Sequence, residues 1–173
     1  MVAASLLLLA PSLTLSLPNL GGKSVGLLPS AKEQATVLMF VLSECPLANK
    51  VMPEFGRIAT KYGARGVRFH LVYVDPKAAL GDLRKHASDF KVPGPLYDRD
   101  RQIVQKLGVT ISPEVRVFRP DGSVAYQGRI DDRFIALGRQ KALTRSDLRI
   151  ALDELLAGQK VSQPKTPSVG CIL

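Results

Sequence analysis

The chain has 173 residues, of which 46% are hydrophobic and 23% are charged, so it has the size and composition of one globular domain rather than of a disordered or fibrous protein. Two cysteines and two histidines are too few for a disulfide-dense scaffold or a four-thiolate zinc site. The formal net charge is +9, but acidic and basic residues are interleaved and tryptophan is absent, so we expect a solvated basic surface and no nucleic-acid partner.

The first segment, residues 1–14, is expected to be an apolar N-terminal segment or a signal peptide. Val2 to Ala10 is apolar except for Ser5, which is the right length for the apolar region of a secretory signal. A secretory signal usually begins with a positively charged residue, and no Lys or Arg precedes Lys23. An ordinary apolar N-terminus is therefore the alternative. A signal would make the protein periplasmic or extracellular, and otherwise it would be cytoplasmic. No apolar run is long enough to predict a membrane-spanning helix.

The rest of the chain alternates between strand and helix patterns. Residues 15–28 suggest a short hairpin or edge element, and residues 35–42 form a continuous apolar run that predicts a strand buried on both faces. The elements expected next are a helix over 47–62, a strand over 67–74, a helix over 78–90, a short strand over 96–98, a helix over 101–107, a hairpin of 114–118 with 123–128, and a helix over about 145–156 with Thr144 as its N-cap. This order predicts an α/β domain over 15–157, with a mixed central sheet flanked by helices, and a proline-containing tail over 158–173.

The chemistry is expected where the first buried strand meets its helix. Cys45 follows this strand, and Pro46 suits the first helical position, so Cys45 is predicted to be the N-cap residue. The positive end of the helix dipole favours thiolate over thiol, which would make Cys45 a nucleophile. Glu44 beside it would favour the neutral thiol if its carboxylate turned inward. The alternative is a buried and inert thiol.

Further candidate residues lie outside the segment around Cys45. Ser112-Pro113, just before the hairpin, is a candidate cis peptide. His70 and His86 stand at no ligand spacing with either cysteine, so no metal site is expected. Asp131 and its neighbour Asp132 lie among arginines, which favours ion pairs over a catalytic carboxylate pair.

The chain resembles the thioredoxin-like superfamily, in the redoxin group near the peroxiredoxins and the membrane-tethered thiol reductases. The matching segments are residues 15–23, the strand-Cys45-Pro46-helix with Pro53 inside the helix, residues 111–115, the hairpin turn at 118–122, and residues 126–132. The resemblance implies a thioredoxin-like fold, with Cys45 in the attacking position and Pro113 as the cis-proline that faces it.

The departures from these relatives concern the residues around Cys45. A thioredoxin-type reductase would carry a second cysteine where this chain has Ala48, and copper-chaperone relatives would carry it at Asn49. A typical peroxiredoxin has threonine and proline where this chain has Leu42 and Leu38. Neither activity therefore carries over whole from the resemblance.

Cys171, in the tail, remains as a partner for Cys45. It is interpreted as the resolving cysteine of an intramolecular disulfide, as an incidental thiol on a disordered tail, or as a cysteine that pairs between chains. The predicted site comprises Cys45, Cys171 and Pro113 as catalytic residues, with Pro46, Thr110, Ser112 and Arg129 near the substrate. Arg129 follows the predicted hairpin strand and is a candidate for a cation near Cys45.

Three functions are compatible with the sequence. The first is a thiol-based oxidoreductase without a cofactor, monomeric or homodimeric, that reacts with a thiol or disulfide protein or with a small peroxide. The second is a non-catalytic thioredoxin-like binding module in which a Cys45–Cys171 disulfide is structural. The third, binding of a polyanion through the net charge, ranks lowest.

Overall fold

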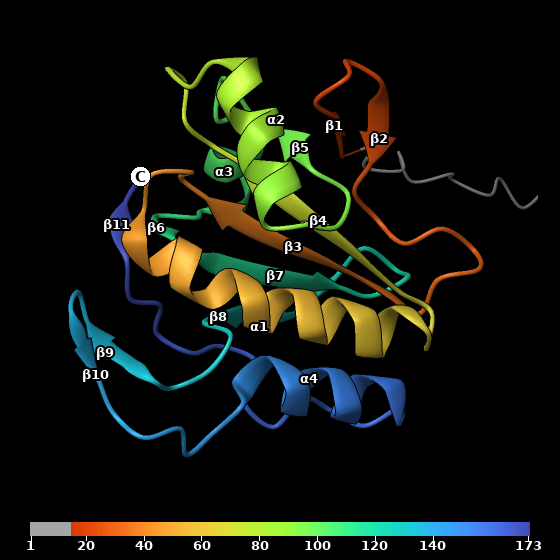
Figure 1. Ribbon diagram of the computed structural model, residues 1–173. Helices are drawn as coiled ribbons and strands as arrows, with labels where there is room; N and C mark the ends of the chain where they lie inside the picture. Colours follow the sequence, from red (N-terminus) through yellow and green to blue (C-terminus); the bar gives the residue numbers. More distant parts are fainter. Residues whose placement is uncertain (1–14) are drawn as a thin grey trace, which may run out of the picture.

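The computed structural model describes residues 15–173, and its centre is one five-stranded sheet. The strand order is β5-β4-β3-β7-β8, in which β3 pairs in parallel with β4 and antiparallel with β7. The strands are β3 (Ala35–Val41), β4 (Val67–Tyr73), β5 (Leu96–Tyr97), β7 (Glu114–Phe118) and β8 (Val124–Gly128). The sheet is therefore mixed, as expected, and helices flank it (Figure 1).

Two apolar layers cover the two faces of this sheet. Side chains alternate along β3, so Val37, Met39 and Val41 join one cluster while Leu38 and Phe40 join the other. Three helices pack on the first face: α1 (Pro46–Gly63), α2 (Leu80–Asp89) and α4 (Asp147–Leu156). The second face is covered by α3 (Gln102–Leu107) and by the hairpin of β1 (Ser16–Pro18) and β2 (Ser24–Gly26). All seven residues of β3 are buried, which explains its unbroken apolar sequence.

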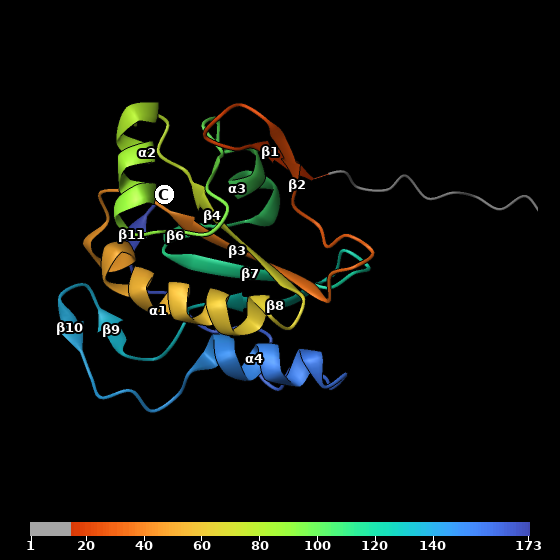
Figure 2. The same cartoon turned by 45° about the vertical axis from the view of Figure 1, so that its right-hand side comes forward.

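Two small strand pairs lie at the N-terminal end of α1. One is the hairpin of β9 (Phe134–Ala136) and β10 (Arg139–Gln140), which projects beside that end of α1 in both ribbon views (Figure 2). The other joins β6 (Ile111–Ser112) to β11 (Cys171–Ile172), the end of the tail. The tail thus folds back onto the domain and is an ordered strand at its end, which excludes the interpretation of a disordered tail.

The predicted start of the last helix is wrong. The helix begins at Asp147 with Ser146 in the N-cap position, and Thr144 is not its cap. The Oγ1 of Thr144 instead donates a hydrogen bond to the carboxylate of Asp132, which also accepts the backbone N–H groups of Thr144 and Arg145. The buried carboxylate competes with the helix for this segment and holds it as a loop.

Other predictions about boundaries differ from the structure in smaller ways. The second helix is shorter than predicted and spans Leu80–Asp89, and no helix within 15–173 has the length and apolar character to cross a membrane. The expectation of a signal or apolar segment over residues 1–14 lies outside the described residues.

Candidate active site

Cys45 occupies the N-cap position of α1, as the sequence predicts. Its backbone is extended, with φ −70° and ψ 114°, and Pro46 takes the first helical position, where its missing N–H costs nothing. Only 2% of Cys45 is exposed. Its Sγ makes no capping hydrogen bond and lies 3.3 Å from the carbonyl oxygen of Ser112. The strand-to-helix turn therefore places this sulfur at the positive end of an 18-residue helix but under a carbonyl group.

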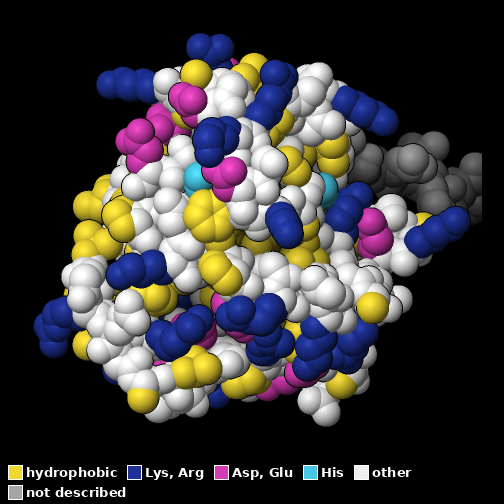
Figure 3. All heavy atoms as spheres, viewed as in Figure 1, with side chains coloured by type: hydrophobic (Ala, Val, Ile, Leu, Met, Phe, Trp, Pro, Cys, Tyr) yellow, Lys and Arg dark blue, Asp and Glu magenta, His cyan; other side chains and the backbone are white. Residues whose placement is uncertain are grey.

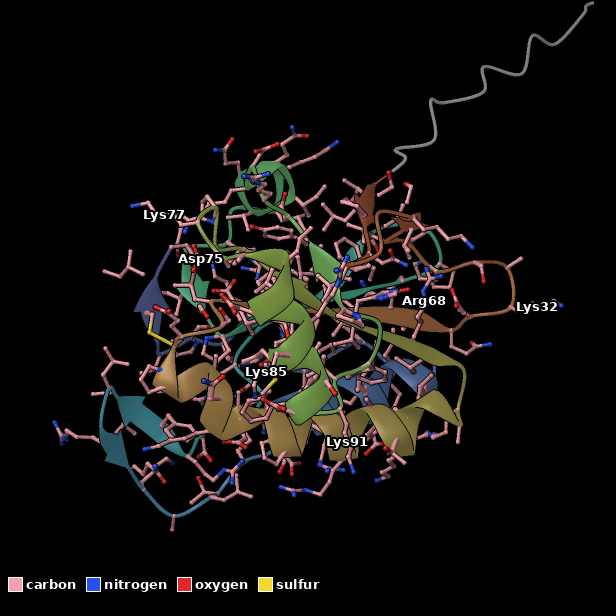
Figure 4. All side chains as sticks on the ribbon, turned by 45° about the horizontal axis from the view of Figure 1, so that its top comes forward. Lys32, Arg68, Asp75, Lys77, Lys85 and Lys91 are labelled. Carbon is pink, nitrogen blue, oxygen red and sulfur yellow. A yellow bond between two sulfur atoms is a disulfide. The ribbon has the colours of Figure 1, made fainter. Side chains whose placement is uncertain are left out.

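Cys45 forms a disulfide with Cys171. The two Cα atoms are 6.2 Å apart although the residues are separated by 126 positions, and Figure 4 shows the bond where β11 meets the start of α1. Two backbone contacts bring Cys171 there: it stands opposite Ser112 in the antiparallel β6–β11 pair, and the N–H of Leu173 donates to the carbonyl of Thr110 at 3.0 Å. Of the three interpretations of Cys171, the structure therefore contains the intramolecular disulfide with Cys45.

Gly170 and Ser112 fix the approach of the tail. A Cβ atom on Gly170 would overlap the carbonyl oxygen of Ser112, so no larger residue fits there without a shift of the strand. The Oγ of Ser112 accepts the backbone N–H of Leu42 at 2.8 Å, which ties the end of the first buried strand to β6. The peptide bond between Ser112 and Pro113 is cis, as predicted.

Thr110 and Arg129, two other predicted site residues, have partners other than the Cys45 sulfur. Thr110 is exposed and contributes its backbone carbonyl to the tail. Arg129 donates from Nε to the Asp147 carboxylate at 2.7 Å, so the cation proposed for Cys45 is already paired. It also lines a small cavity together with Pro113. A role for Arg129, Thr110 or Pro46 in binding substrate stays a prediction.

A groove beside the disulfide was not foreseen from the sequence. It has a volume of about 350 Å³ and lies between the start of α1 and the β9–β10 hairpin. Its lining residues are Pro46, Leu47, Lys50, Phe134, Leu137, Gly138, Gln140 and Cys171. The signal that could have revealed the hairpin is the apolar run of residues 134–137 followed by Gly138, whose φ of +75° suits a tight turn.

The two histidines and the paired aspartates have structural partners. His86 bridges two side chains, with Nδ1 2.8 Å from the Tyr73 hydroxyl and Nε2 2.9 Å from Oδ1 of Asn49. Burial lowers the pKa of His86 and of His70 below the ordinary value of 6.5.

The paired aspartates form the ion pairs that the sequence predicts: Asp131 pairs with Arg133, and Asp132 pairs with Lys141. Both carboxylates are buried rather than on the surface. Within residues 15–173, no three His, Cys, Asp or Glu side chains are grouped to hold a metal ion.

Comparison with known proteins agrees with the fold described above. The family model described as Redoxin matches residues 8–134. An uncharacterized conserved protein from Geobacillus kaustophilus has a similar structure, with a TM-score of 0.81 and 28% identity over 92% of this chain and 87% of that chain. A hypothetical protein from Sinorhizobium meliloti 1021 is similar with a TM-score of 0.80 and 23% identity, over 92% of this chain and 89% of that chain. A putative thiol:disulfide interchange protein DsbE from Chlorobium tepidum shares the fold, with a TM-score of 0.61 and 22% identity over 84% of this chain and 92% of that chain. No curated protein matches the chain.

Proposed function

The chain belongs to the redoxin family, and from this premise we propose that it is a thiol oxidoreductase whose Cys45 and Cys171 cycle between a disulfide and two thiols. Redoxins are usually thiol oxidoreductases. The observation that carries the proposal is that both cysteines of the chain meet at a helix N-terminus, where a thiolate is favoured.

Thiol–disulfide exchange is the reaction that the site supports best. Two thiols of the protein and one disulfide of a partner would give one disulfide of the protein and two thiols of the partner, through a mixed disulfide. Peroxide reduction has less support, because the positions at which typical peroxiredoxins carry threonine and proline hold Leu42 and Leu38. Leu42, at the threonine position, has no hydroxyl group to offer a peroxide, and Leu38, at the proline position, is fully buried in an apolar cluster.

The reduction potential of the Cys45–Cys171 pair tests the proposal. Equilibration in glutathione buffers, followed by acid quenching and alkylation, gives the fraction of disulfide by mass spectrometry. We expect a potential within the range of exchange proteins, about −120 to −270 mV. A potential below about −300 mV would identify a structural bond and support the non-catalytic binding module instead.

A second measurement separates the two oxidants. Reduced protein is mixed with oxidised glutathione or with hydrogen peroxide, and the appearance of the disulfide, about 2 Da lighter for the loss of two hydrogens, is followed by mass spectrometry. Exchange predicts faster closure with oxidised glutathione at equal concentration. In Cys171→Ser, a sulfenic acid on Cys45 that forms rapidly with peroxide and persists would favour peroxide reduction.

A further inference from the structure

We propose that Cys171, and not Cys45, is the sulfur that bonds to the partner protein, and that the partner's cysteine segment docks in the groove between α1 and the β9–β10 hairpin. The inference rests on the proposed function. It reverses the roles expected from the sequence, in which Cys45 attacks the partner and Cys171 resolves the bond.

Access to the two sulfurs differs in the oxidised protein. Cys45 is 2% exposed and lies beneath the Ser112 carbonyl, whereas Cys171 is half-buried and forms part of the groove wall. An attacking thiolate must reach the sulfur that it bonds to, so the rate of exchange depends on this access. The structure leaves Cys171 as the open side of the bond.

The leaving groups differ in the same direction. Attack on Cys171 expels the Cys45 sulfur as a thiolate at the N-terminus of α1, where the helix dipole stabilises it. Attack on Cys45 would expel Cys171 from a two-residue strand, which offers no such stabilisation. A better stabilised thiolate leaves faster, so both access and leaving group favour attack on Cys171.

The groove indicates which kind of segment would dock. Leu47, Phe134 and Leu137 give it apolar walls, and Leu137 is 58% exposed. Among the described residues that line the groove, Lys50 is the one charged side chain and none is a carboxylate, so this lining attracts a thiolate. Ile172, next to the disulfide, is 82% exposed. Hydrophobic side chains also gather at the left edge of the surface in Figure 3, where Figure 1 places β11 and the start of α1. The partner is therefore a protein with a cysteine beside an apolar side chain.

The exchange then runs in two balanced steps. The partner's thiolate bonds to the Cys171 sulfur, the Cys45–Cys171 bond breaks, and its electron pair leaves with Cys45. A second thiolate of the partner then attacks the partner's own sulfur in the mixed disulfide and releases the Cys171 thiolate. The partner's two thiols are oxidised to a disulfide, the protein's disulfide is reduced to two thiols, and the protons pass from the former to the latter. In the reverse direction, Cys171 attacks the partner and the Cys45 thiolate resolves the bond.

The attacked sulfur can be identified by trapping. Oxidised protein is mixed briefly with reduced glutathione, quenched with acid, labelled with N-ethylmaleimide, digested and analysed by mass spectrometry. We expect glutathione on Cys171 and maleimide on Cys45 in about tenfold excess over the opposite arrangement, the ratio that 1.4 kcal/mol corresponds to. Glutathione on Cys45, or an even distribution, would overturn the inference while the proposed function stands. No mixed disulfide on either cysteine would contradict both.

Docking in the groove needs a second probe. Synthetic tripeptides with leucine or with serine on both sides of a cysteine are compared as reductants of the oxidised protein. Partial burial of a leucine predicts that the leucine peptide reacts about threefold to tenfold faster. Leu137→Asp should abolish this preference, whereas Val124→Asp, a matched change of another exposed apolar residue, should keep it. Equal rates for both peptides with the wild type would overturn the groove as the docking site.

The charge of the groove is tested separately. Lys50→Glu should slow reduction by either peptide about twofold to fivefold at low salt, since an exposed charge pair contributes less than about 1 kcal/mol. Lys32→Glu is the matched control, because Lys32 lies on an exposed loop on the other side of the molecule from the disulfide (Figure 4). Equal slowing by both variants would show a general charge effect and would contradict the attraction assigned to Lys50.

Discussion

Ser112 connects three parts of the candidate site at the scale of a single residue. Its hydroxyl accepts the N–H of Leu42, its carbonyl oxygen lies 3.3 Å from the sulfur of Cys45, and its backbone pairs with Cys171. In the reduced protein the carbonyl would accept a hydrogen bond from the thiol, whereas the helix N-terminus favours the thiolate. The Ser112 carbonyl and the helix N-terminus thus act in opposite directions on the Cys45 sulfur. This balance suits the proposed exchange, in which Cys45 leaves as a thiolate in one direction and attacks as a thiolate in the other.

Removal of the Ser112 hydroxyl should destabilise the protein. Ser112→Ala leaves the partly buried N–H of Leu42 without its acceptor, so we expect the free energy of unfolding to fall by about 1–3 kcal/mol in urea titrations. Ser162→Ala serves as the control, since Ser162 is exposed. Equal stability of Ser112→Ala and wild type would mean that Leu42 finds another acceptor.

The two histidines predict a loss of stability in mild acid. Burial lowers their pKa in the folded protein below 6.5, so the unfolded chain binds protons that the folded chain does not as the pH falls below about 6.5. The free energy of unfolding should therefore be smaller at pH 5.5 than at pH 7.5. The difference should shrink in His86→Gln, and an identical pH dependence in this variant would contradict the assignment to His86.

At the scale of elements, the short β6–β11 pair determines whether the two cysteines meet. Gly170 permits this pair, because its missing Cβ leaves room for the Ser112 carbonyl. The tail is also held earlier, where the N–H of Gln127 on β8 donates to Pro164 and the N–H of Thr166 donates to Gln127. Cys171 thus approaches Cys45 from an anchored segment, which lowers the conformational entropy lost when the disulfide closes.

Gly170→Ala should weaken the disulfide. Overpacking of this kind costs about 1–3 kcal/mol, so the equilibrium constant for closure in a glutathione buffer should fall by about fivefold or more. Gly26→Ala is the matched control, because Gly26 also lies in a strand but has open space around its Cβ position. If both variants closed as readily as the wild type, the contact between Gly170 and Ser112 would not govern the pairing.

At the scale of the whole molecule, the disulfide closes a loop of 126 positions, most of the domain. In the chain-entropy model such a closure stabilises the folded state by about 4–5 kcal/mol, through the entropy that it removes from the unfolded chain. Each turnover of the proposed reaction would therefore alternate between a more and a less stable form of the same fold.

This difference is measurable with Cys171→Ser. We expect its free energy of unfolding in urea to lie several kcal/mol below that of the oxidised wild type and close to that of the wild type in dithiothreitol. A variant as stable as the oxidised wild type would indicate that the unfolded chain is already compact, and that the bond contributes little to stability.

The sequence alone determined the sheet-and-helix order, the buried strand β3 and the position of Cys45 before Pro46, because these depend on local periodicity and on the missing N–H of proline. It also supported the cis bond at Pro113 through a resemblance. Only the tertiary structure decided which of three interpretations of Cys171 holds. The two-residue strand β11 carries no periodic signal, and β6, with which it pairs, lies about sixty positions away in sequence. The groove is likewise tertiary: Lys50 and Leu137 come from distant segments and become neighbours only when α1 and the β9–β10 hairpin pack together.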